Sequence, residues 1–167
     1  LGTGDDVYVL ADLTTDTVNG VSGTDSLAAV GGVTIANTVD FGTYTNFDKL
    51  IASAATTDVI SFSAKADFVS DTGISTIDLS ADTNTTGTNI IDLSLVTTGT
   101  HTITGSAGAD IVTGGGVADD VTLGTGDDVY VLADLTTDTV TGTSGTDSLA
   151  AVGGVTIGVG VDFATYT

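Results

Sequence analysis

Aspartate recurs every nine residues in the segment 105–131. Asp110, Asp119 and Asp128 hold the sixth place of three consecutive nonapeptides, GSAGADIVT, GGGVADDVT and LGTGDDVYV. The eighth place of each nonapeptide holds a large apolar residue: Val112, Val121 or Tyr130. Carboxylates spaced so regularly in glycine-containing turns are hard oxygen ligands. The chemistry that this spacing suits is therefore the binding of a divalent cation.

The same pattern extends beyond these three units. After one inserted residue it continues with Asp138 and Asp147, and it recurs near the start of the chain at Asp6, Asp16 and Asp25. The unit 133–141 has no glycine, and Val117 replaces a turn glycine in the unit 114–122. We expect good cation geometry near Asp110, Asp119 and Asp128, and a poor site or none at Asp138 and Asp16. Asp6 would lack the half of its site that preceding nonapeptides supply.

The identity of the cation follows from the donor atoms. Two carboxylates brought close together repel each other unless a cation lies between them. Ca²⁺ accepts six to eight carboxylate and carbonyl oxygens in a flexible turn, whereas Mg²⁺ prefers a stricter octahedron with more water. A single His and the absence of Cys argue against zinc. The sequence therefore predicts Ca²⁺ as the cofactor.

The nonapeptide also predicts the elements that hold these carboxylates. Its first six residues read as a turn, with Gly108 and Gly126 at the fourth place, where glycine allows backbone angles that other residues avoid. Its last three residues read as a short strand that points one apolar side chain inward. Two nonapeptides would form one turn of a flattened coil. Residues 18 apart, such as Asp110 and Asp128, would then be neighbours about 4.8 Å apart along a parallel stack.

These nonapeptides resemble the RTX, or haemolysin-type, calcium-binding repeat. The stretch from Ile74 to Asp110 resembles the segment that leads into such repeats in bacterial RTX surface-layer (S-layer) proteins and large repetitive adhesins. The resemblance implies a right-handed parallel β-roll or β-solenoid, type I secretion, a place at the cell surface and Ca²⁺ in the turns. The site residues that it implies are Asp110, Asp119, Asp128, Asp6, Asp147, Asp25, Gly108 and Gly126.

The amino-acid composition excludes several classes of protein and favours a β-rich fold. All 22 acidic residues are Asp, against two Lys, so the net charge of the 167-residue chain is −20. Such a surface repels nucleic acid. Without Glu, Gln, Met or Arg, but with many Thr and Val, the chain favours strands over helices. Its apolar fraction of 41% argues against disorder. No apolar run is long enough to span a membrane, and the opening LGTGDD does not resemble a signal peptide. We expect an all-β fold with little or no helix.

A second, longer repeat divides the chain. Residues 1–45 recur at 123–167 with six differences, an offset of 122 residues. We therefore expect a window of a longer tandem array, with a two-copy chain as the alternative. The predicted segments are a partial repeat with a β-roll tail (1–45), an irregular segment (46–104), the nonapeptide β-roll (105–150) and the start of the next irregular segment (151–167).

The segment 46–104 lacks nonapeptides but alternates apolar with polar residues, as half-buried strands do. It is expected either to continue the solenoid as irregular coils, which we favour, or to pack as a small β-sandwich. Residues 46–54 and 64–71 could each form a short helix, with Asn46 as an N-cap and Gly73 as a stop signal.

Two features resemble catalytic motifs. Asp71-Thr72-Gly73 spells the aspartic-protease triplet, but that chemistry needs two such carboxylates and the triplet occurs once. His101 is the single His, and it is expected to be an exposed strand residue because its surroundings, THTIT, read as a strand. The sequence does not predict an enzyme.

The expected function is structural. The chain would be a calcium-binding repeat segment of a secreted bacterial surface protein, in an S-layer, lattice or extracellular filament that folds and assembles on binding Ca²⁺. The alternatives are the stalk of an RTX adhesin or the RTX tail of a secreted hydrolase. Expected partners are copies of itself, neighbouring repeats and a cell-surface polysaccharide, with no nucleic acid and no membrane-spanning segment.

Overall fold

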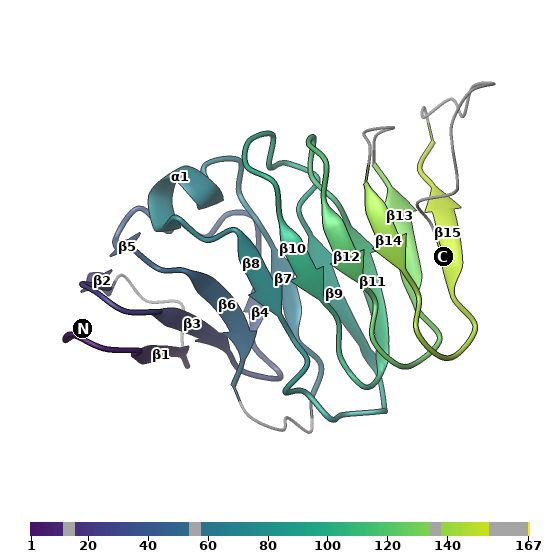
Figure 1. Cartoon of the computed structure of the whole chain (residues 1–167), viewed down its shortest axis with the longest axis horizontal. Helices are drawn as coiled ribbons and strands as arrows, with labels where there is room; N and C mark the ends of the chain where they lie inside the picture. The colour runs from purple at the N-terminus through teal and green to yellow at the C-terminus, as the bar shows by residue number, and fades with distance from the viewer. Residues whose placement is uncertain (12–15, 54–57, 134–137, 154–166) are drawn as a thin grey trace.

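Parallel strands dominate the computed structural model, which describes residues 1–11, 16–53, 58–133, 138–153 and 167 (Figure 1). One sheet has seven strands, in the order β1 (Val7–Leu10), β3 (Ser26–Ala29), β6 (Lys49–Ala52), β8 (Thr76–Asp78), β10 (Thr102–Thr104), β12 (Asp120–Thr122) and β14 (Thr139–Thr141). A second has six, in the order β15 (Ser148–Ala151), β13 (Val129–Leu132), β11 (Ala109–Thr113), β9 (Thr88–Asp92), β7 (Ser61–Ser63) and β4 (Thr34–Ile35). A third pairs β2 (Val18–Asn19) with β5 (Tyr44–Thr45).

Register in the nonapeptide region follows the sequence period. From β8 onward, successive strands alternate between the seven-stranded and six-stranded sheets. Ile111 pairs with Val129, a step of 18 residues, and the inserted residue lengthens the next step, Val129 to Ser148, to 19. Every pairing is parallel in the described part of the chain, so the mostly β, parallel-stranded character predicted from the sequence is confirmed.

Strands of the irregular segment 46–104 join the same two sheets. β8 pairs with β6 on one side and with β10 on the other, so the seven-stranded sheet continues into the nonapeptides without a break. Register steps here range from 21 to 29 residues. Longer connections are therefore accommodated between strands. Most of the segment 151–167 lies outside the described residues.

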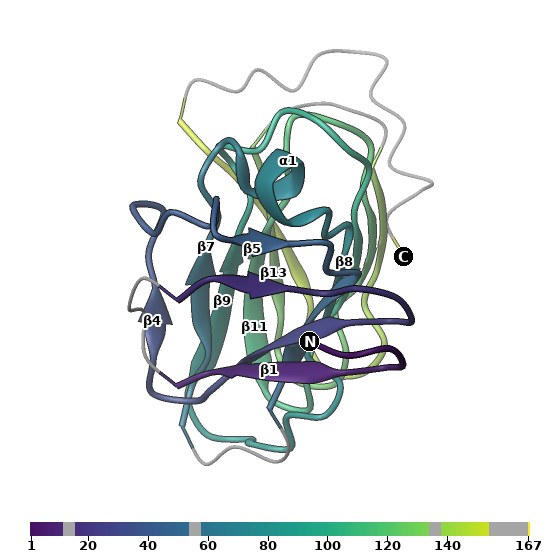
Figure 2. The same cartoon turned by 90° about the vertical axis from the view of Figure 1, so that its left-hand side faces the viewer.

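A third side, formed by the two-stranded sheet and a helix, lies beside the two larger sheets near the N-terminus. The pair β2–β5 and the helix α1 (Phe68–Thr72) lie on this side, with α1 packed on β5 (Figure 2). The prediction of a helix over 64–71 is confirmed in part by α1, which ends at Gly73 with φ of 86°. No helix in the described ranges is long and apolar enough to cross a membrane.

The helix predicted over 46–54 is wrong. Residues 49–52 form β6, in which Leu50 and Ala52 are buried while Lys49 and Ile51 are half-buried. Pairing with β3 and β8 on both edges imposes the period-2 pattern on this segment. Tertiary pairing thus outweighs the local helix signal, including the predicted N-cap at Asn46.

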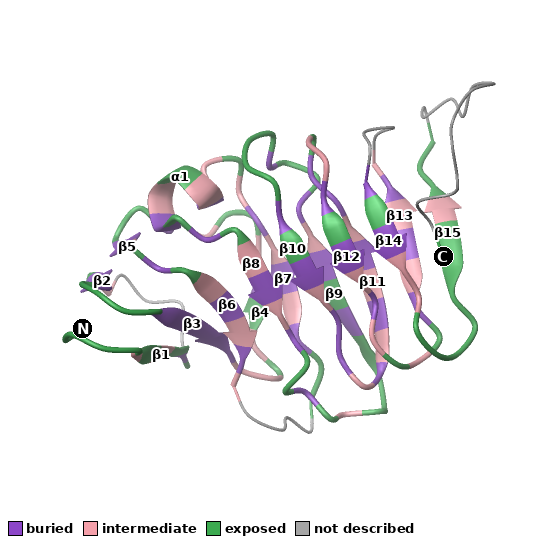
Figure 3. Cartoon of the chain, in the orientation of Figure 1, coloured by how far each residue is buried: buried purple, intermediate pink, exposed green. Residues whose placement is uncertain are grey.

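Buried apolar residues form one core between the sheets, and Figure 3 marks the buried stretches of the strands in purple. Val112, Val121 and Tyr130, the eighth-place residues, are fully buried. Beside the third side, the rings of Phe41, Phe62 and Phe68 pack in edge-to-face contacts, with centroids 5.1 to 6.5 Å apart. One or two buried apolar residues per strand therefore form the core between β11, β12, β13 and β14, and aromatic rings form it beside α1 and β5.

Candidate metal centre

Most of the sixth-place aspartates, together with Asp48, Asn89 and His101, form two rows. One row follows each of the two larger sheets, with its members just before or within the first two residues of their strands. Row 1, along the seven-stranded sheet, comprises Asp6, Asp25, Asp48, His101, Asp119 and Asp138. Row 2, along the six-stranded sheet, comprises Asn89, Asp110, Asp128 and Asp147. Within these rows Asp25, Asp110, Asp119, Asp128 and Asp138 are at most 3% exposed.

Backbone amides link neighbouring members of each row. In row 2, the Asp110 N–H donates to Asp128 Oδ1 at 2.8 Å, and the Asp128 N–H donates to Asp147 Oδ1 at 3.2 Å. In row 1, the Asp6 N–H donates to Asp25 Oδ1 at 3.1 Å. Each of these three acceptor carboxylates thus bonds an amide of the preceding strand or of the residue just before it. Asp110 and Asp128 lie at neighbouring positions beside the paired strands β11 and β13, as their 18-residue spacing predicts.

Hydrogen bonds within the turn occupy the second oxygen of two predicted ligands. Asp110 Oδ2 accepts from the Ser106 N–H at 2.7 Å, and Asp119 Oδ2 accepts from the Gly115 N–H at 2.8 Å. Asp110 Oδ1 also accepts from the Ser106 hydroxyl at 3.1 Å, and Asp119 Oδ1 accepts from the His101 N–H at 3.0 Å, so both oxygens of each carboxylate have a donor. Calcium ligation by Asp110 and Asp119 stays a prediction.

The two aspartates expected to give a poor site bond to tyrosines. Asp138 Oδ2 accepts from the buried Tyr130 hydroxyl at 2.8 Å, and Asp16 Oδ2 accepts from the Tyr8 hydroxyl. Tyr8 and Tyr130 hold the same place in the two 45-residue copies. The tyrosine thus provides a donor to the aspartate of the glycine-free unit.

Asp128 differs from these residues because Oδ2 is buried and has no hydrogen-bond partner in the described part of the chain. Burial raises the pKa of the Asp128 carboxyl to about 6, with the Asp110 amide opposing this shift and the charges of Asp110, Asp147 and Asp127 adding to it. Asp6, which holds the same place in the first copy, also has an Oδ2 without a partner. The two LGTGDD turns thus each present one open carboxylate oxygen.

Few basic groups lie near these buried carboxylates. Among the described residues, Lys65 forms salt bridges with the exposed Asp40 and the half-buried Asp67, and His101 Nδ1 lies 2.8 Å from Asp119 Oδ1. Asp128 and Asp110 have no such partner there, and burial raises the pKa of Asp110 as well. A buried charge without a counterion is costly, so a cation beside Asp128 would stabilise the folded chain.

The donor set at Asp128 fits Ca²⁺ if backbone carbonyls contribute. No group of three or more acidic or His side chains in the described ranges is arranged to hold a metal by itself. Asp128 would supply Oδ2, and carbonyls of the adjacent glycine turns would have to complete the shell, as Ca²⁺ allows. The predicted glycines lie in these turns. Gly126 has φ of 136°, and a Cβ there would lie 2.6 Å from the Gly108 carbonyl oxygen.

His101 is buried, so its prediction as an exposed strand residue is wrong. It precedes β10 in row 1, where its Nδ1 lies 2.8 Å from Asp119 Oδ1. Its row position turns the side chain toward the core, and Nε2 has no hydrogen-bond partner among the described residues. In the protease-like triplet, Thr72 ends α1 and its hydroxyl donates to the Phe68 carbonyl at 2.8 Å.

Sequence reasoning missed three members of the rows: Asp48, Asn89 and His101. Asn89 Oδ1 accepts from the Ile60 N–H at 2.8 Å, and Asp48 Oδ2 accepts from the Asp25 N–H at 2.8 Å. Each of the three lies two residues before a buried Leu or Ile, as Asp110 lies two before Val112. A search for a polar residue two positions before a large apolar residue, with no requirement for turn glycines, would have found them.

No protein-family model matches the chain, and no match was found among curated proteins or among solved structures.

Proposed function

We propose that this chain is a structural, calcium-binding repeat segment of a secreted bacterial cell-surface protein. The observation that carries the proposal is the buried Oδ2 of Asp128, which has no partner in the described structure and lies among the charges of Asp110, Asp127 and Asp147. A carboxylate in that setting favours a cation. The same LGTGDD turn recurs around Asp6, so this candidate cation site is part of the 122-residue repeat.

The proposed architecture is a right-handed parallel β-roll, or β-solenoid, of the RTX type. Its support is the register, which advances by 18 or 19 residues per coil through the nonapeptides. Further support comes from the two rows of aspartates at corresponding places of successive coils. The resemblance of the nonapeptides to the RTX repeat supports the same architecture.

The mechanism is electrostatic. Without a cation, the buried carboxylates oppose folding because the chain has 22 acidic residues and two Lys. Bound Ca²⁺ would neutralise the charge at the LGTGDD turns, and its binding free energy would add to the free energy of folding. Such a chain would cross a type I secretion channel unfolded and fold outside the cell, where Ca²⁺ is abundant.

Within this class we favour an S-layer, surface lattice or filament over the stalk of an adhesin, and both over the tail of a secreted hydrolase. Near-identity of the 45-residue copies favours the first two, because a uniform array suits a structural role. Ordered sheets or filaments of the purified repeats in Ca²⁺ would support a lattice or filament, whereas monomeric rods would support a stalk.

Calorimetric titration of the chain with CaCl₂ tests the proposal. We expect the double variant Asp6→Asn, Asp128→Asn to lose most of the Ca²⁺ binding of the parent chain. The control Asp120→Asn removes one charge at an exposed position of β12 and should bind as the parent does. Equal binding by the double variant and the parent would show that the LGTGDD turns are not the calcium sites.

A further inference from the structure

The two copies of the 45-residue repeat occupy different environments, and the comparison shows which surface is uncovered. β3 and β15 share the sequence SLAA. All four residues of β3 are buried, with Leu27 at 0% exposure, whereas Leu149 in β15 is 42% exposed (Figure 3). Asp25 is likewise buried, and its counterpart Asp147 is exposed.

What covers β3 is visible in the structure. Leu27 pairs with Leu50 of β6, and the Asp48 N–H donates to the Asp25 carbonyl at 2.8 Å. Phe47, which precedes this strand, packs in the same core cluster as Leu27. Segment 46–52 is therefore the part of this cover that pairs directly with the outer edge of β3. The second copy matches residues 1–45, so the chain contains no second version of this segment.

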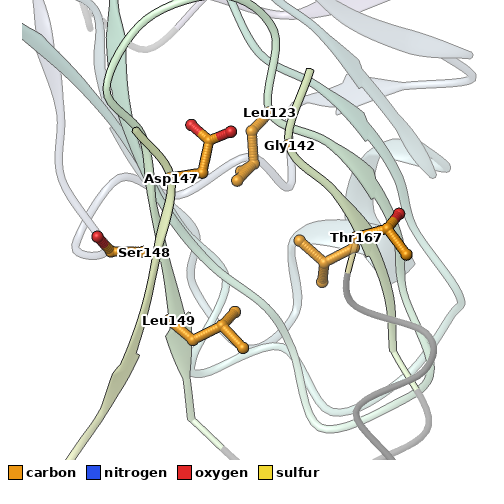
Figure 4. Close-up of a pocket in the computed structure, with 7 residues that line it drawn as sticks. Leu123, Gly142, Asp147, Ser148, Leu149 and Thr167 are labelled. Atoms are coloured by element: carbon orange, nitrogen blue, oxygen red, sulfur yellow. The ribbon is translucent and has the colours of Figure 1, made fainter. Parts of the chain in front are cut away.

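The corresponding place beside β15 is hollow. An open cavity of about 150 Å³ is lined by Leu123, Val140, Gly142, Asp147, Ser148, Leu149 and Thr167 (Figure 4). A cavity of this size accommodates a benzene ring, and the segment that covers β3 carries the ring of Phe47. The hollow thus matches an aromatic residue followed by a strand.

A backbone hydrogen bond beside the hollow is the same as in the first copy. The Gly142 N–H donates to the Thr167 carbonyl at 2.6 Å, as the Gly20 N–H donates to the Thr45 carbonyl at 3.0 Å. These four residues are equivalent pairs in the two copies. The second copy thus has the same backbone hydrogen bond that, in the first copy, directly precedes segment 46–52.

We infer that the hollow and the outer edge of β15 form a docking surface for a segment with the sequence of residues 46–52 from another copy of the repeat. This inference rests on the tandem architecture proposed above, and it identifies the contact between successive copies of the repeat. Docking would add a strand to β15 as β6 adds to β3. Because β3 lies in the seven-stranded sheet and β15 in the six-stranded one, the six-stranded sheet of one copy would continue as the seven-stranded sheet of the next.

Thiol reactivity tests this docking, because the chain has no Cys. Leu149→Cys would be placed in the present chain and in a chain extended after Thr167 by a copy of residues 46–104. We expect the thiol to react at least about tenfold more slowly in the extended chain, because a covered strand opens rarely. Leu27→Cys in the same extended chain serves as the protected reference and reports that the first copy is folded.

A matched extension with Leu50→Pro in the appended copy should restore fast reaction, because proline cannot occupy a central paired strand. Equal reactivity of Leu149→Cys in the present and extended chains would overturn the inference. So would protection in the present chain that grows with protein concentration, since a second molecule would then be the occupant. Measurements with EGTA and with Ca²⁺ separate this contact from the calcium proposal. Docking predicts that Leu149→Cys in the extended chain is protected under every condition in which Leu27→Cys is protected, whatever the response to Ca²⁺.

Discussion

Asp128→Asn in the absence of calcium is the sharpest perturbation of the candidate site. Asn keeps a carbonyl oxygen in the place of Oδ1, so the Asp110 N–H retains its acceptor. The substitution removes the charge that burial and neighbouring carboxylates disfavour. We therefore expect the metal-free variant to be more stable than the parent at pH 7.

The magnitude follows from the pKa of Asp128, which rises from 3.8 to about 6. A shift of that size corresponds to about 3 kcal/mol at about 1.4 kcal/mol per pH unit. Solvent beyond the turn screens the neighbouring charges, so we expect about 1–2 kcal/mol. The folded state binds this proton more tightly than the unfolded state does. The penalty is therefore absent below pH 3.8, grows between pH 3.8 and 6, and is complete above pH 6.

Urea unfolding in EGTA at several pH values measures this difference, with a fixed concentration of a stabilising osmolyte such as sucrose to populate the folded metal-free chain. The stability advantage of Asp128→Asn over the parent should increase as the pH rises from 4 to 7. Asp120→Asn, an exposed carboxylate, should stay within about 0.5 kcal/mol of the parent. With saturating CaCl₂ the order should invert, because the parent would gain binding free energy that the variant lacks.

Two results would refute this reasoning. A metal-free variant less stable than the parent at pH 7 would mean that the Asp128 charge stabilises the fold through its amide donor. An advantage of the variant that persists unchanged in saturating CaCl₂ would mean that no calcium ion is bound at Asp128.

Three further predictions concern packing and turns. Leu27→Ala should cost about 2–5 kcal/mol in urea unfolding, and Leu149→Ala under about 1 kcal/mol, because the first is buried and the second is 42% exposed; equal costs would contradict the burial difference. Tyr130→Phe should cost about 1–2 kcal/mol by the same measurement, because it removes a buried hydrogen bond to Asp138; no loss would show that the bond contributes nothing. Gly126→Ala should lower the thermal midpoint, since φ there is 136°, whereas Gly153→Ala, with open space around it, should not.

The periodic part of the fold was predictable from the sequence. The nine-residue spacing determines which side chains face inward, and Val112, Val121 and Tyr130 are all buried as expected. The 18-residue step between paired strands also follows from it, because strands of successive nonapeptides alternate between the two sheets. Regular spacing carries this information because each coil repeats the backbone geometry of the one before.

The irregular part was less predictable. Steps of 21 to 29 residues contain no fixed period, so neither the third side nor the strand β6 could be derived from spacing. Local helix signals at Phe68–Thr72 and at 46–54 look alike in sequence. They differ in outcome because β6 has strand partners on both edges, whereas α1 packs on β5 at the third side.

The proximity of the candidate ligands was predictable, but their hydrogen bonds were not. The spacing predicts that Asp110 and Asp128 lie beside neighbouring strands, as they do, yet it does not show which carboxylate oxygens have donors. That depends on turn amides, such as the Ser106 N–H that bonds Asp110 and has no counterpart at Asp128 Oδ2. It also depends on row members outside the nonapeptides, such as His101 beside Asp119.

Far-UV circular dichroism of the chain in EGTA, titrated with CaCl₂ and separately with MgCl₂, tests the central claim most directly. We predict a transition from a largely unfolded spectrum to a β-rich one with Ca²⁺ alone, because the buried aspartate rows oppose folding until a cation is bound. A spectrum that is already β-rich in EGTA and unchanged by Ca²⁺ would contradict the account. The rows would then be carboxylates held by backbone amides in a metal-free stack of parallel strands.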